Sequence, residues 1–279
     1  MIVSPAPPTD LPDLVDAYEQ TARAVLGLGR SCPPERAGDP TPCPGWDVFA
    51  QVAHVESVEA TFLGDSPPAV EISERAHVRS DMGRFMEQLV ESRRNLTLAE
   101  LCDRLESVIE RRLEQWRRPG LTLETEEPGP FGMASVADVI GIRCFDIWTH
   151  EQDLRETLGR PGGLDSPAAS LSLARVYAAL GRVVTRAGVP VGGAVVVEVR
   201  GPVSGRQAVR VVDVDGRARG ALVDDVADED TRCVLVLGTR EMGRLAAGRI
   251  PMGEEDFVWT AHGDAEVAAA LVQNLSVTP

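Results

Sequence analysis

The chain contains no lysine, and all 28 of its basic residues are arginines. This absence excludes Schiff-base catalysis, which needs a lysine amine, and a Walker-type phosphate loop, whose motif needs a lysine. The 43 acidic residues leave a net charge of −15. Because such a charge repels a phosphate backbone and an anionic bilayer, we expect neither nucleic acid nor membrane as a partner.

Cysteines are few, and their number is odd. They stand at positions 32, 43, 102, 144 and 233, and no pair has CxxC spacing. This pattern argues against a disulfide framework and against a cysteine-rich zinc site. The first ten residues lack the features of a signal peptide, and no apolar run approaches the ~20 residues that span a bilayer. We therefore expect a cytoplasmic protein.

The 279 residues are enough for two domains. Apolar residues recur at helical spacing through most of the first two thirds of the chain, between capping residues and Gly or Pro stops. The pattern predicts helices over 11–29, 48–63, 74–94, 98–118, 135–158 and 166–187. These helices can form an antiparallel bundle with an added helix.

The sequence changes character near Gly188. Short β-branched runs follow, with a turn signal at Asp215–Gly216, and helices are predicted near 239–249 and 265–275. The fold class is therefore α+β, with a helical domain over 1–188 and a smaller α+β domain over 189–279.

The segment around 143–153 carries the most informative chemistry. Arg143, Asp146, His150 and Asp153 follow one another at offsets of three or four residues, so they share one face of a largely apolar helix. Ionisable groups drawn into a bundle core must be paired or bind a metal. Asp146 and His150 can reach one divalent ion, and His54, on another helix, is the best third ligand. The same spacing also fits a helix-surface ion pair.

Other candidates carry weaker signals. His77 is expected on the polar side of the 74–94 helix, and His262 in a turn. Cys144 points away from the face of Asp146 and His150, and Cys43 is expected to be structural. The sequence after His150 lacks the second histidine of a zincin motif, and neither GxSxG nor GxGxxG occurs in a matching context.

Two stretches resemble the signatures of the maleylpyruvate isomerase family, a branch of the DinB-like metalloenzymes. TPCPGWDVFAQVAHV is similar to a Cys-Pro-Gly-Trp turn that leads into a helix with a ligand histidine, here His54. IRCFDIWTHEQDLRETLGRPG is similar to the second signature, with an acidic residue four positions before a histidine. LVLGTREMGRLAAGR and FVWTAHGD resemble the small second domain of the family, which is related to sterol-carrier folds.

The resemblance implies a DinB-like bundle with a four-helix core plus an extra helix, and a zinc ion, or another divalent metal, bound by His54, Asp146 and His150. Asp146 replaces the glutamate of the isomerase. The resemblance further implies mycothiol as the thiol cofactor, Arg249 as a substrate contact, and Arg143 and Asp153 as residues that orient the ligands.

The expected activity is a mycothiol-dependent isomerase or S-transferase acting on a small electrophilic substrate, which can carry a carboxylate. Two alternatives remain. One is a small-molecule binding protein with a structural or vestigial metal. The other is a metal-dependent hydrolase that needs no thiol. The sequence does not indicate an oligomeric state.

Overall fold

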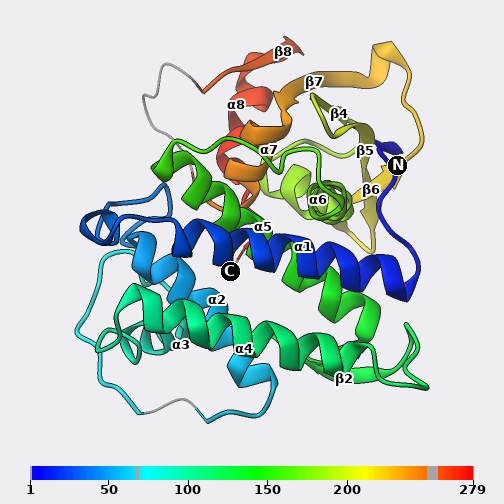
Figure 1. Ribbon diagram of the computed structural model, residues 1–279. Helices are drawn as coiled ribbons and strands as arrows, with labels where there is room; N and C mark the ends of the chain where they lie inside the picture. Colours follow the sequence, from blue (N-terminus) through cyan, green and yellow to red (C-terminus); the bar gives the residue numbers. More distant parts are fainter. Residues whose placement is uncertain (1, 67–68, 250–256, 279) are drawn as a thin grey trace. The chain divides into compact units, whose positions relative to one another are not determined.

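The computed structural model describes residues 2–66, 69–249 and 257–278 (Figure 1). They form two compact units, one of residues 8–163 and one in which residues 2–7 join residues 164–278. The predicted fold class, α+β with a helical part and a smaller sheet-containing part, is confirmed. No helix within the described ranges is long and apolar enough to cross a bilayer.

The helical unit is a four-helix core with one added helix. The core helices are α1 (Leu11–Arg30), α2 (Val48–Phe62), α4 (Leu98–Trp116) and α5 (Val136–Leu158). Helix α1 packs against α4 and α5, and α2 packs against the same two helices. The added helix α3 (Asp81–Glu91) lies on α2. A 3-10 turn (Pro34–Arg36) and a hairpin of β2 (Glu126–Gly129) and β3 (Gly132–Ser135) complete the unit.

The helix starts follow from side-chain caps that the sequence predicts. Asp10, Asp47 and Ser135 each accept a hydrogen bond from the backbone N–H three residues on. Thr97 does the same. The Glu100 carboxylate in turn accepts a hydrogen bond from the backbone N–H of Thr97, which completes a capping box. These caps fix where α2 and α5 begin.

The third helix is shorter than predicted. It begins at Asp81, after the Ser80 cap, rather than near residue 74. The expected helical position of His77 is therefore wrong: His77 lies in a turn, and its Nε2 is 3.1 Å from Oε2 of the buried Glu87. Arg75 also pairs with Glu87, so this carboxylate holds the segment before α3 out of helical geometry.

The second unit contains a mixed sheet. Its strands are β1 (Ile2–Ser4), β4 (Ala194–Arg200), β5 (Ser204–Val214), β6 (Arg217–Val223), β7 (Thr231–Gly238) and β8 (Trp259–Gly263). The order is β1-β5-β4-β7-β8, with β6 also on β5; β4 and β7 are parallel and the other pairs antiparallel. The predicted Asp215–Gly216 turn joins β5 to β6, and both residues have positive φ. His262 lies in β8 rather than in a turn.

Three helices and a short 3-10 turn (Asp228–Asp230) belong to this unit. Helix α6 (Pro167–Arg186) packs on β5, β6 and β1, and α7 (Thr239–Ala246) and α8 (Ala265–Asn274) contact β7. Sequence periodicity places α6 in the bundle and the boundary at residue 188, whereas the compact units divide at residues 163 and 164. The difference arises because an amphipathic stripe shows that a helix is half-buried but does not identify its partner.

Helix α6 approaches the sheet closely at a pair of glycines. A Cβ on Gly181 would lie 2.3 Å from the carbonyl oxygen of Gly220, and a Cβ on Gly220 would lie 2.3 Å from that of Gly181. We expect Gly181→Ala to lower the free energy of unfolding by about 1–3 kcal/mol through overpacking. Thermal unfolding checks this, with Arg182→Ala at the next, exposed position as the control. Equal melting temperatures of the two variants would contradict the close-packing explanation.

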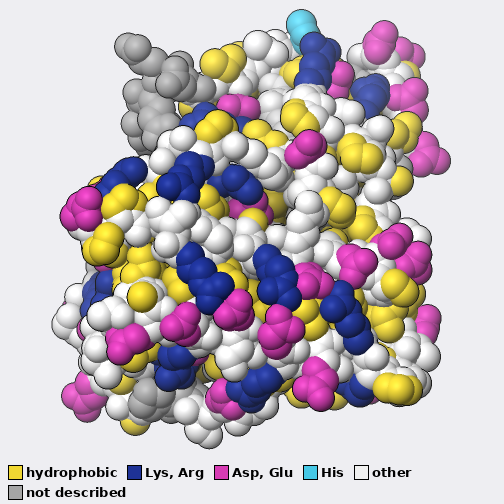
Figure 2. Space-filling model, in the orientation of Figure 1, with side chains coloured by type: hydrophobic (Ala, Val, Ile, Leu, Met, Phe, Trp, Pro, Cys, Tyr) yellow, Lys and Arg dark blue, Asp and Glu magenta, His cyan; other side chains and the backbone are white. Residues whose placement is uncertain are grey.

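Arginines and carboxylates are interleaved on the face of the helical unit that α1 and α4 form (Figure 2). Arg23 pairs with Glu110, Arg30 with Glu106, and Arg117 with both Asp16 and Glu19. Because these pairs are exposed, each contributes little to stability. They also show that the large negative net charge does not make this face uniformly acidic.

Candidate metal centre

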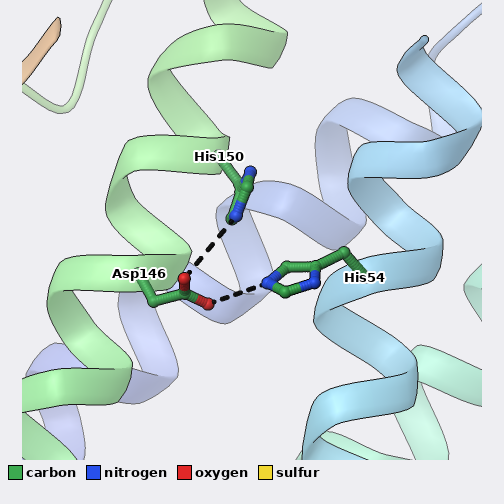
Figure 3. A group of neighbouring side chains, drawn as sticks. All are labelled: His54, Asp146 and His150. Atoms are coloured by element: carbon green, nitrogen blue, oxygen red, sulfur yellow. Dashed lines mark hydrogen bonds and ion pairs between the residues drawn. The ribbon is translucent and has the colours of Figure 1, made fainter. Parts of the chain in front are cut away.

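Three side chains predicted as ligands meet inside the helical unit (Figure 3). His54 comes from α2, and Asp146 and His150 come from consecutive turns of α5. One potential ligand atom from each residue lies within 4.8 Å of the other two. The His54 Nε2 is 3.1 Å from the Asp146 Oδ2, and the His150 Nε2 is 3.7 Å from the Asp146 Oδ1. Both imidazoles therefore point at the same carboxylate.

The centre is buried on the histidine side and open at the carboxylate. The His54 and His150 side chains are 6% and 5% exposed, whereas that of Asp146 is 27% exposed. Burial by itself raises the pKa of Asp146, but the Arg143 guanidinium and the two histidines outweigh it and hold this pKa well below its usual range. Asp146 is thus an anion at neutral pH, as a metal ligand must be.

The outer nitrogen of His150 is fixed by Gln51, one turn before His54 on α2. The Gln51 Oε1 hydrogen-bonds His150 Nδ1, while its amide Nε2 donates to Thr41 Oγ1 (2.6 Å) and to Asp153 Oδ2 (3.2 Å). Because the amide donates on its nitrogen side, its oxygen must accept the proton of His150 Nδ1. In the neutral imidazole, which is the form that binds a metal, the lone pair of His150 is then on Nε2, which faces Asp146.

Asp153 contacts this amide. Its Oδ2 is 3.8 Å from His150 Nδ1, beyond hydrogen-bonding distance, and it accepts instead from Gln51. The role of Asp153 in orienting His150 stays a prediction, and its hydrogen bond from Gln51 is the contact through which it would act. Gln51 itself escapes sequence analysis, because a glutamine before a histidine is common and only its partners on α5 reveal its place.

Trp46 contacts both imidazoles, stacked on His150 and tilted against His54. Its ring centroid is 4.9 Å from that of His54 and 5.6 Å from that of His150. The indole Nε1 donates to Glu87 Oε2 at 2.8 Å. The Cys43–Trp46 turn thus supplies an apolar wall for the centre, and the Cys43 carbonyl accepts the Trp46 N–H within that turn.

Arg143, one turn before Asp146 on α5, contacts both Asp146 and Glu59. Its Nη1 donates to Asp146 Oδ2 at 2.9 Å, and its Nε donates to Glu59 Oε1 at 2.5 Å. The predicted contact between Arg143 and a ligand is therefore present. Cys144, in contrast, is buried away from the group, and burial raises the pKa of its thiol.

Arg249 belongs to the other compact unit. It follows α7, its side chain is buried, and its guanidinium donates to the carbonyl of Ala247. Its assignment as a substrate contact stays a prediction.

Two histidines and one carboxylate presented by facing helices of a bundle form a donor set from which three-ligand metal sites are built. Residues 3–155 match the family model described as the mycothiol maleylpyruvate isomerase N-terminal domain. The chain belongs to this family.

Two solved structures are similar over nearly the whole chain. The crystal structure of the mycothiol-dependent maleylpyruvate isomerase has a TM-score of 0.57 and 16% identity, covering 91% of this chain and 93% of that one. A histidine-to-alanine mutant of that isomerase gives a TM-score of 0.55 and 15% identity, with the same coverage. At this identity the likeness establishes the fold. No curated protein sequence gives a significant match.

Proposed function

We propose that the chain is a metal-dependent enzyme that uses mycothiol. It would either isomerise a small electrophilic substrate or attach the thiol to it through sulfur, as an S-transferase does. The convergence of His54, Asp146 and His150 carries this proposal. Ligand atoms around a tetrahedral zinc ion, with bonds near 2.0–2.2 Å, lie roughly 3.4 Å from one another. The observed 3.1 and 3.7 Å, which reach different oxygens of Asp146, bracket that value. One ligand atom from each residue lies within 4.8 Å of the other two, so side-chain adjustment would bring all three onto one zinc-sized cation.

The number and type of donors favour a catalytic site. Two imidazoles and one carboxylate form the donor group found among the described residues, and three protein ligands leave a coordination position for another molecule. A structural site, as in a binding protein, takes four protein ligands. Because Asp146 is the exposed member, the approach to this position lies beside the carboxylate.

Charge favours an anionic fourth ligand such as a thiolate. The buried Arg143 and Arg112 share the single carboxylate of Glu59, so a divalent cation bound with Asp146 would leave a net positive charge in a buried setting. A cation bound there would lower the pKa of a coordinated thiol and favour the thiolate near neutral pH. Mycothiol is the thiol in the name of the family and of the two similar structures.

The chain's own residues would hold and orient these partners. Gln51 and Asp153 keep His150 with its lone pair on Nε2, and Trp46 excludes water from the imidazole side. Arg249 is proposed to pair with a substrate carboxylate. Reversible addition of the thiol to a double bond would allow rotation about that bond, which is the chemistry of an isomerase, and retention of the thiol would give a transferase.

Metal analysis tests the first step of this proposal. We expect about one divalent ion per chain in protein purified from metal-replete medium, because three converging ligands bind zinc far more tightly than isolated side chains do. Treatment with a chelator should abolish turnover of an electrophile plus mycothiol, and one equivalent of zinc should restore it. Metal-free protein with undiminished turnover would contradict the proposal.

A further inference from the structure

Asp146 is supported by a chain of charged side chains that runs across three helices, α5, α2 and α4. Arg143 on α5 donates to Asp146 and to Glu59 on α2. The second oxygen of Glu59 accepts from Arg112 Nε on α4 at 2.8 Å. The side chains of Glu59, Arg112 and Arg143 are 0%, 1% and 4% exposed, so water screens none of these charges.

Aromatic rings fix the far end of this chain. The Arg112 guanidinium lies 3.9 Å above the Trp116 ring, which itself meets Tyr18 of α1 edge to face at 4.7 Å. These ring contacts restrict the orientation of the Arg112 guanidinium, and therefore the way it pairs with Glu59. Glu59 in turn has one geometry in which to meet Arg143.

The position of Glu59 matters to a cation because Arg143 is itself a buried cation beside the ligand carboxylate. With Glu59 charged, Arg143 is neutralised from its other edge and takes only one oxygen of Asp146, leaving Oδ1 facing His150. Without the Glu59 charge, Asp146 is the carboxylate in this chain of contacts that still pairs with Arg143. It then competes with a metal ion for Asp146 and repels the ion.

We infer that Glu59 is a positioning residue of the metal centre: through Arg143 it keeps the Asp146 carboxylate available to a divalent cation. This inference rests on the metal site of the proposed function and adds a residue to it that does not touch the ligands. The shorter Asp146, in place of the glutamate of the isomerase signature, makes its placement more dependent on such support, since it has one fewer torsion with which to reach the ion.

The chain provides a matched control on the same helix. Glu56 lies one turn before Glu59, is equally buried, and also pairs with two arginines, Arg93 at 2.6 Å and Arg104 at 3.0 Å. Arg93 donates to Glu56 and to Ser92, and Arg104 donates to Glu56, so these pairs are distinct from the contacts that link Glu59 to Asp146. Loss of the Glu56 charge therefore has the same kind of cost to folding without the same path to the metal.

The experiment measures zinc affinity by competition with a chromogenic chelator, and the melting temperature of the metal-free proteins. We expect Glu59→Gln to weaken zinc binding about 10- to 100-fold, the range for residues that support a ligand, and Glu56→Gln to keep the wild-type affinity. Both variants should melt below the wild type. Wild-type affinity in Glu59→Gln, or an equal loss in Glu56→Gln, would overturn the inference.

A double variant, Glu59→Gln with Arg112→Gln, guards against misfolding. It removes a buried charge of each sign, so it should melt above the single Glu59 variant yet still bind zinc weakly. Wild-type affinity in the double variant overturns the role of Glu59. If the wild-type protein itself binds no zinc, both the proposed function and this inference fail. If the wild type binds zinc and Glu59→Gln binds it equally well, the inference alone fails.

Discussion

His54→Ala and His150→Ala should each remove the metal from the purified protein. Apparent zinc-binding free energies of about 10–16 kcal/mol for four-ligand sites imply about 2.5–4 kcal/mol per ligand. Loss of one ligand then weakens binding by roughly 100- to 1,000-fold. Because the two histidines belong to different helices, equal losses would show that the ion bridges α2 and α5 rather than lying along α5 alone.

His262→Ala is the control, because it removes a histidine that lies exposed on β8 in the other unit. This variant should retain stoichiometric metal. A second readout is the rise in melting temperature on adding zinc, which follows from binding to the folded state alone and should vanish in the His54 and His150 variants. Stoichiometric zinc in either variant would show that the ion is held elsewhere.

The sequence identifies the three candidate ligands of this centre but not the residues that surround them. Asp146 and His150 are one helical turn apart, so their convergence follows from α-helix geometry. His54 lies on another helix. Helical periodicity is compatible with a role for it as a ligand, but the resemblance of the flanking Cys-Pro-Gly-Trp segment to the family signature is what selects it. The structure confirms that all three side chains converge.

The supporting residues depend on contacts between helices, which no local pattern encodes. Glu59 and Glu56 differ by one helical turn in an ordinary run of carboxylates, and the partners across the bundle decide which of them meets Arg143. The roles of Gln51 and Trp46 likewise become apparent only from the contacts that these residues make with α5. A glutamate among 43 acidic residues carries no signal of its role.

The fold shows the same division between local and tertiary information. Capping residues such as Asp47 and Ser135 predict where helices begin, because the cap is a local interaction. Helix α6 packs on β5, β6 and β1 and approaches the sheet closely where Gly181 meets Gly220, and its own apolar stripe does not identify these partners. The three-residue strand β1 is stabilised by pairing with β5, some 200 residues away, so its own sequence gives no strand signal.

Omission of mycothiol should abolish turnover, whatever the physiological substrate is. The first electrophile to assay is maleylpyruvate, which is named in the two similar structures. A free thiol with a pKa near 8.5 is only a few per cent thiolate at pH 7, and a cation held by His54, Asp146 and His150 would raise that fraction. Metal and thiol should therefore be required together, and each alone should give the background rate.

Mycothiol methylated on sulfur provides the matched control for this assay, because it retains the rest of the molecule but cannot form a thiolate. It should not support turnover and should inhibit the reaction with unmodified mycothiol. Unchanged mycothiol at the end of the reaction identifies an isomerase, and stoichiometric consumption into a thioether identifies an S-transferase. Equal rates with and without thiol would instead assign the open coordination position to activated water and make the protein a hydrolase.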